Sequence, residues 1–88
     1  MSEKEGKLIG KVCHYFSNIG VAVIELSGPL SIGDTIRIVG GEETDFEQTV
    51  DSMERDHEKM EKAKKGDAIG TKVKEKVREG YKVYIINE

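Results

Sequence analysis

The stretch His57-Glu-Lys-Met-Glu61 begins like a metalloprotease motif, in which two histidines four residues apart on a helix hold zinc. Glu61 occupies the position of the second histidine, so one of the two imidazole ligands is missing. The motif requires both histidines, so the metalloprotease pattern fails here. We therefore interpret it as a solvated turn and predict neither a metal nor another cofactor.

Cys13 and His14 are a thiol and an imidazole side by side in a segment of alternating polarity. A catalytic Cys–His pair needs hydrogen-bond contact, but neighbouring residues of a strand point to opposite faces. The paired carboxylates, such as Glu42 and Glu43, have no apolar surroundings that would adapt them to acid–base work. We predict no catalytic residues, although His14 and Tyr15 could form a stacking surface for a base or another ring.

The run KVKEKVREG, residues 72–80, places a lysine at every second position from Lys72 to Lys76. If a strand extends that far, the three ammonium groups lie on one face. Lysines on a strand often prevent edge-to-edge aggregation, and that is one interpretation. The other is a surface that contacts RNA phosphates or an acidic protein. The residues of this candidate binding surface are Lys72, Lys74, Lys76, Arg78, Arg37, His14 and Tyr15.

The composition indicates one small domain with a highly charged surface. Apolar residues make up 36% of the 88 residues, charged residues make up 35%, and the net charge is −3. A chain of this size forms one core, and its charge creates no overall positive field that would attract nucleic acid. Any RNA binding would therefore depend on a local patch.

Cysteine usage and the absence of long apolar runs bear on location. A single cysteine excludes an internal disulfide and favours a reducing compartment. Residues 1–6 are charged, have no apolar signal region and are expected to be a disordered tail. The longest apolar run, Val21–Ile24, is too short to cross a bilayer. We predict a cytoplasmic protein without membrane contact.

The alternation of apolar and polar residues predicts six strands in one domain over residues 7–88. Glycine-containing turns separate them, and the Ser27-Gly28-Pro29 break must end a strand because proline has no amide hydrogen. At most one short helix is expected, near residues 58–65, where Met60 and Ala63 are three residues apart. The predicted strands cover residues 7–16, 21–26, 35–39, 44–55, 68–74 and 80–86.

The same pattern predicts which residues face the core. Ile36 and Ile38 should point inward, and in the first strand Leu8, Val12 and Phe16 should share one face. Short, evenly spaced strands are typical of a sandwich or a barrel. Because so few residues are available, closing the sheet is the simplest way to hide its edges. We predict an all-β, six-stranded, closed or nearly closed antiparallel barrel.

Five segments, in this order, resemble known barrels: GVAVIEL, GPLSIGDTIRIVG, QTVDSMERD, AKKGDAIG and VREGYKVY. Together they resemble the second-domain β-barrel of translational GTPases such as elongation factor Tu, and the short free-standing proteins that share this layout. They are also similar to the small barrel at the C-terminal end of collagenase-like peptidases. The likeness covers residues 7–86.

The resemblance implies a non-catalytic binding or docking module that contacts RNA or a protein of translation or RNA modification. In the GTPases the nucleotide site lies in a separate domain, and this chain has no G-x-x-x-x-G-K-[ST] loop, so we expect no GTP binding. The alternative hypothesis is a protein–protein adaptor, or an accessory subunit of a peptidase-like or other enzyme encoded on a separate chain. The partner and the oligomeric state stay open.

Overall fold

The computed structural model describes residues 6–41, 44–55 and 58–86. These residues contain ten strands, and no helix among them could span a membrane. The strands in chain order are β1 (Lys7–Phe16), β2 (Val21–Leu26), β3 (Leu30–Ser31), β4 (Thr35–Gly40), β5 (Thr44–Thr49), β6 (Met53–Arg55), β7 (Glu58–Met60), β8 (Lys62–Ala63), β9 (Ala68–Lys72) and β10 (Lys82–Ile86).

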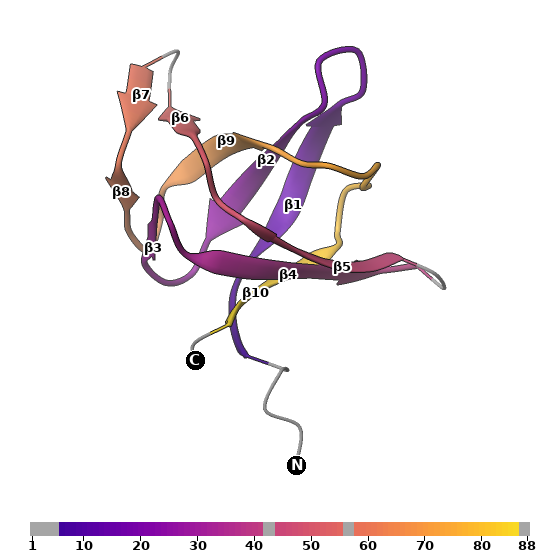
Figure 1. The fold of residues 1–88 in the computed structure, drawn as a ribbon, viewed down its shortest axis with the longest axis horizontal. Coiled ribbons are helices and arrows are strands. Elements are labelled where there is room, and N and C mark those ends of the chain that lie inside the picture. The colour runs from indigo at the N-terminus through magenta and orange to yellow at the C-terminus, as the bar shows by residue number, and fades with distance from the viewer. Residues whose placement is uncertain (1–5, 42–43, 56–57, 87–88) are drawn as a thin grey trace.

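Eight strands form one strongly curled antiparallel sheet in the order β5-β4-β10-β1-β2-β9-β6-β7 (Figure 1). The remaining two, β3 and β8, pair with each other. The predicted hairpin between the first two strands is confirmed, since β1 and β2 pair through Phe16 and Val21 at their turn. The break at Pro29 is also confirmed, because β2 ends at Leu26 and Pro29 lies outside the strands.

The predicted all-β class and antiparallel pairing are confirmed, whereas the prediction of a closed or nearly closed, six-stranded barrel is wrong. Among the described residues β5 pairs only with β4, and β7 only with β6, so the sheet has two edges. The predicted long strand over residues 44–55 is interrupted at residues 50–52. There the Val50 amide donates to the Asp34 carbonyl oxygen, and the Val50 carbonyl accepts from the Gly33 amide. Backbone groups bound to a turn are not free to continue a ladder, so the sheet stays open.

The sequence allows at most one short helix, near residues 58–65, and the structure has none there. Glu58–Met60 forms β7 and Lys62–Ala63 forms β8. Met60 is paired with the buried Met53 of β6, and Ala63 is paired with the buried Leu30 of β3. The spacing of three residues between Met60 and Ala63 therefore reflects two separate strand contacts instead of one helix face.

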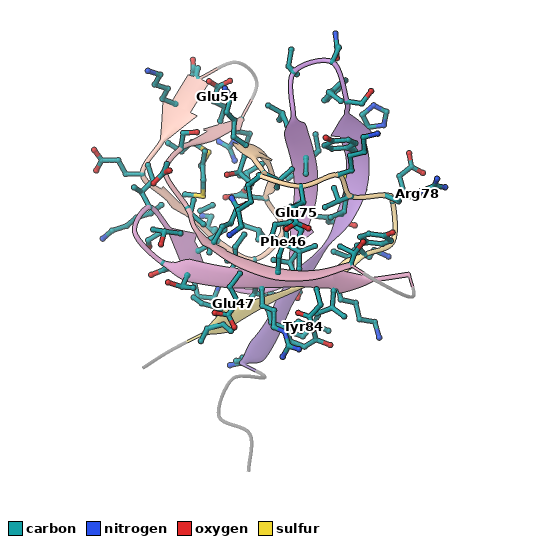
Figure 2. All side chains as sticks on the ribbon, turned by 45° about the vertical axis from the view of Figure 1, so that its right-hand side comes forward. Phe46, Glu47, Glu54, Glu75, Arg78 and Tyr84 are labelled. Carbon is teal, nitrogen blue, oxygen red and sulfur yellow. The ribbon has the colours of Figure 1, made fainter. Side chains whose placement is uncertain are left out.

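The core lies inside the curl of the sheet, where Phe46 points inward (Figure 2). Ile36 and Ile38 are fully buried, as the sequence predicts. Because the buried apolar side chains come from almost every strand, their burial holds the sheet in its curled form. The buried apolar residues are Ile9, Val12, Ala22, Ile24, Leu26, Leu30, Ile36, Ile38, Phe46, Val50, Met53, Ala63, Ile69, Val77, Val83 and Ile86.

Strand β1 departs from simple alternation at two points. Its register shifts between Leu8 and Gly10 against β10, and again between Val12 and His14 against β2. A bulge moves the following side chains to the other face of a strand. Ile9 and Val12 are therefore both buried, whereas Leu8 is 48% exposed and Phe16 is 43% exposed. The prediction that Leu8, Val12 and Phe16 share one face is wrong.

Candidate binding groove

The lysines of the predicted surface do not share a strand. Strand β9 ends at Lys72, so Lys74 and Lys76 lie with Arg78 in the connection to β10. The predicted alignment of three ammonium groups on one strand face is therefore wrong. All four cationic side chains are nevertheless exposed, and three of them follow one another along the connection.

The connection over residues 73–81 is held against the domain by its apolar residues and its backbone. Val77 is 3% exposed and belongs to the core. The Val73 amide donates to the Gly20 carbonyl oxygen, and the Gly80 amide donates to the Val12 carbonyl oxygen. Because Val77 points inward, the neighbouring Lys76 and Arg78 point toward solvent. In Figure 2, Arg78 extends away from the body of the domain.

The side chain of Gln48 joins β5 to the end of β9 across the gap in the sheet. Its Nε2 donates to the Lys72 carbonyl oxygen at 2.7 Å, and its Oε1 accepts from the Lys74 amide at 3.0 Å. An amide side chain offers a donor and an acceptor, as a backbone peptide does. Gln48 thus takes the place of a strand neighbour and fixes the backbone that carries Lys72 and Lys74.

We expect Gln48→Ala to lower the free energy of unfolding by about 1 kcal/mol, because two hydrogen bonds are lost at an exposed site. The larger effect should be local. Exchange of the Lys74 amide with solvent should become faster, as measured by hydrogen exchange. Gln48→Glu is the matched control: it keeps an acceptor for the Lys74 amide and should preserve most of its protection. Unchanged protection in Gln48→Ala would contradict this role.

Next to the connection, two half-buried tyrosines and two exposed cations line an open groove of about 710 Å³. We call it the aromatic–cationic groove and define it by Tyr15, Tyr81, Lys76 and Arg78. Both tyrosines also pack against the core, so their rings are held in place. Held aromatic rings give contact area at a low entropic cost, and flexible cations beside them add charge recognition. Thr44, Ser17 and Glu79 add polar groups to the wall.

His14, which the sequence groups with Tyr15, does not line this groove. Its ring lies edge-on to Phe16, with ring centroids 4.4 Å apart and planes at 69°. Its Nδ1 is 3.4 Å from the Glu79 Oε2, and both side chains are largely exposed. The predicted stacking surface of His14 with Tyr15 is thus divided: Tyr15 faces the groove, and His14 contacts its own hairpin and the connection.

Arg37 is also separate from the groove. It lies on β4, where its Nε and one terminal nitrogen donate to the two carboxylate oxygens of Asp45, each at 2.7 Å. It lines a different hollow, together with Tyr84 and Val39. The structure therefore unites Tyr15, Lys76 and Arg78 of the predicted surface and places Arg37 and His14 elsewhere.

The hydrogen bond from Arg37 lowers the pKa of the Asp45 carboxyl below its ordinary value of 3.8, and the positive charge of Arg37 adds to this effect. Because the pKa is lowered in the folded chain, the stabilisation is fully present above the ordinary value. It is lost as the pH falls through the folded pKa. We expect Arg37→Gln to raise the midpoint of the Asp45 titration toward 3.8, as measured by carboxyl-carbon NMR. An identical midpoint in both proteins would contradict this explanation.

The sequence also singles out a thiol and a metalloprotease-like stretch. Cys13 is an exposed free thiol. Within residues 6–41, 44–55 and 58–86, no group of three histidine, cysteine or carboxylate side chains could hold a metal ion. His57, with which the metalloprotease-like stretch begins, lies outside these residues.

The most informative groove residue that the sequence reasoning missed is Tyr81. It follows Gly80, which has a φ of 93°, and its ring lies against Gly40, which has no side chain to exclude it. The only sequence signal is a tyrosine after a glycine turn together with a glycine pair at residues 40–41. These features are forty residues apart, and only the pairing of β4 with β10 brings them together.

The curled all-β fold is similar to that of two solved domains. Two crystal structures of the C-terminal domain of a protein described as a U32 peptidase from Geobacillus thermoleovorans superpose on it with TM-scores of 0.84 and 0.86. They cover 89% and 92% of this chain, and 98% and 93% of those domains, at 19% identity. At that identity the likeness establishes the fold alone.

Two longer proteins are similar in sequence. An uncharacterised protease of Methanocaldococcus jannaschii is 44% identical over 80 residues, or 91% of this chain. A collagenase of Porphyromonas gingivalis is 44% identical over 77 residues, or 86% of this chain. The chain spans about a fifth of the length of these relatives, 20% and 21%. No family model matches the chain.

These comparisons confirm the resemblance to the C-terminal domain of collagenase-like peptidases. The resemblance to the second barrel of elongation factor Tu stays a prediction.

Proposed function

We propose that this chain is a non-catalytic accessory domain or subunit of a peptidase-like protein. The observation that carries the proposal is the 44% identity, over nearly the whole chain, to about a fifth of two proteases, one from an archaeon and one from a bacterium. A folded unit that recurs as a small part of proteases fits a binding role, with the bond-breaking chemistry in the remaining four fifths.

The aromatic–cationic groove suggests what such a domain would bind. Tyr15 and Tyr81 offer ring faces to apolar side chains, and Lys76 and Arg78 can pair with carboxylates of an extended polypeptide. The groove is open to solvent, so a polypeptide can reach these side chains. We therefore propose that it holds polypeptide for the peptidase, and that residues of the groove contribute to affinity instead of catalysis.

A chimera tests the proposal. The segment of the Porphyromonas gingivalis collagenase that matches this chain would be replaced by the chain itself. We expect collagen cleavage within about tenfold of the natural enzyme, a difference of about 1.4 kcal/mol, whereas deleting the segment should abolish cleavage. Fragment release from collagen is the measurement.

Variants of the chimera and the isolated chain test the binding role and the non-catalytic role separately. In the chimera, Lys76→Glu with Arg78→Glu should raise KM, whereas the control Lys59→Glu with Lys62→Glu, exposed on β7 and β8, should not. A chimera as inactive as the deletion would contradict the accessory role. Cleavage of collagen by the isolated 88-residue chain would contradict the non-catalytic part of the proposal.

RNA binding, our leading hypothesis from the sequence, has less support. The connection carries cations at residues 72–78, but Glu75 and Glu79 are interspersed with them, and the chain has a net charge of −3. The similarities found are to peptidases and give no support to a role in translation. RNA binding stays a prediction, and its signature would be a tRNA affinity that falls steeply as salt is added.

A further inference from the structure

A second hollow lies on the outer face of the sheet, where β1 runs between β2 and β10. It encloses about 370 Å³, within the range of ~300–1,000 Å³ typical of ligand clefts. Leu8, Gly10 and Leu26 contribute to its lining, and Leu8 is 48% exposed. The hollow is thus apolar and open to solvent.

The rim of this hollow has a net positive charge, whereas the chain as a whole has a net negative charge. Lys11, Lys65 and Lys82 line it, together with a single carboxylate, Glu25, whereas the chain carries a net charge of −3. We call the hollow the lysine-rimmed groove and define it by Leu8, Lys11, Lys65 and Lys82. An anionic partner would meet a local excess of positive charge there.

The strand register leaves the positive charge of this rim only partly compensated. Lys11 lies directly opposite Lys82 on β10, and opposite Glu25 on β2. Like charges directly opposite each other on neighbouring strands are destabilising. None of the ion pairs formed among the described residues involves Lys11, Lys65 or Lys82. An exposed leucine beside lysines that form no ion pair with a described residue is better explained by a partner than by packing.

We infer that the lysine-rimmed groove docks an acidic polypeptide segment that carries an apolar side chain. The apolar side chain would cover Leu8 and the bare backbone of Gly10, and the carboxylates would reach Lys11 and Lys82. The occupant is a segment of the larger, catalytic part of the peptidase-like protein, so this assignment rests on the proposed function. The groove would then fix this domain in place, while the aromatic–cationic groove remains free for polypeptide substrate.

The test uses the 88-residue chain labelled with nitrogen-15 and the octapeptide Glu-Asp-Glu-Leu-Phe-Glu-Asp-Glu as the probe. We expect amide shifts at Leu8, Gly10, Lys11 and Lys82, and an affinity that weakens as salt is raised. A peptide with lysine at every acidic position, or with serine in place of the Leu-Phe pair, should bind at least about tenfold more weakly.

Variants locate the site on the protein. Lys11→Glu with Lys82→Glu should weaken binding of the acidic peptide at least about tenfold, and Leu8→Ser should also weaken it. All three side chains are exposed, so the fold should persist. The control Lys59→Glu with Lys62→Glu should stay within about twofold, because these lysines lie on β7 and β8.

Shifts confined to the aromatic–cationic groove, or equal binding of the lysine peptide, would overturn the inference. Different results would refute this docking site and the proposed accessory function. An active collagenase chimera that is insensitive to Lys11→Glu with Lys82→Glu refutes this docking site alone. An inactive chimera, together with acidic-peptide binding at Leu8 and Lys11, refutes the accessory role and leaves the peptide site established.

Discussion

Replacing Gly10 by alanine is expected to lower the free energy of unfolding by about 3 kcal/mol. Gly10 lies in the central strand β1, at the register shift opposite β10. A methyl group there would sit 2.6 Å from the Glu25 carbonyl oxygen and 3.0 Å from the Ile24 Cγ2. Because the first obstacle is backbone of the neighbouring strand, relief requires strands to separate. Urea denaturation of both proteins measures the loss.

Gly28→Ala is the matched control for this prediction. The nearest atom to a methyl group at Gly28 would be the Ile9 Cγ2, at an ordinary contact distance of 3.4 Å, and Gly28 has no positive φ. Alanine also restricts the unfolded chain, which stabilises by about 0.4 to 1 kcal/mol where the backbone is compatible. We expect Gly28→Ala to be neutral or slightly stabilising. Equal losses at the two positions would show that close strand contact is not the cause at Gly10.

Gly40→Ala is expected to destabilise by about 2 kcal/mol and to displace an aromatic ring from the groove. The added methyl group would overlap the Cδ1 and Cγ atoms of Tyr81. These atoms lie at the base of the ring, so rotating the ring tip away does not relieve the overlap. Tyr81 would have to leave its place against the core. NMR shifts of the Tyr15 and Tyr81 ring protons report the displacement.

A double-mutant cycle separates this contact from a general effect of alanine in β4. In a Tyr81→Ala background the obstacle is absent, so adding Gly40→Ala should cost little. The two substitutions should therefore be strongly non-additive in urea unfolding. If Gly40→Ala costs the same with and without Tyr81, the ring contact does not determine the need for glycine at this position.

The two grooves lie on separate parts of the surface. The aromatic–cationic groove lies beside the connection from β9 to β10, and the lysine-rimmed groove lies over β1 with β2 and β10. Their linings share no residue, although both include residues of β1. Substitutions on one rim should therefore leave binding at the other almost unchanged, which makes the two proposals independently testable.

The sequence by itself determined the local features of the fold. Alternating β-branched residues in Val21–Leu26 and around Ile36 and Ile38 specify strands, because period-two burial is a property of each strand alone. Gly33 and Gly66 adopt left-handed φ values of 97° and 95° in the turns that the sequence predicts. The all-β class followed from such local signals, as did the resemblance to the peptidase domain.

Only the tertiary structure decided how the strands combine. Whether the sheet closes depends on where the backbone groups of residues 50–52 find partners. Those of Val50 are in the turn after β3, and the Ser52 carbonyl accepts from the Thr71 hydroxyl of β9. The apolar residues Met60 and Ala63 pair with strands of two different sheets, β6 and β3, which a helix pattern over a few residues cannot reveal. Long-range pairing of this kind is not encoded in local periodicity.

The candidate site was also predictable from the sequence only in its residue types, and its geometry depends on the tertiary structure. The residue types at Tyr15, Lys76 and Arg78 were visible in the sequence, because charge and aromaticity belong to single side chains. Their meeting with Tyr81 was not, since it requires the connection after β9 to fold back over β1 through the burial of Val77. A bulge in β1 also reverses which of its side chains face outward. Such a one-residue shift in register is set by the neighbouring strands, so the residues of β1 alone do not predict it.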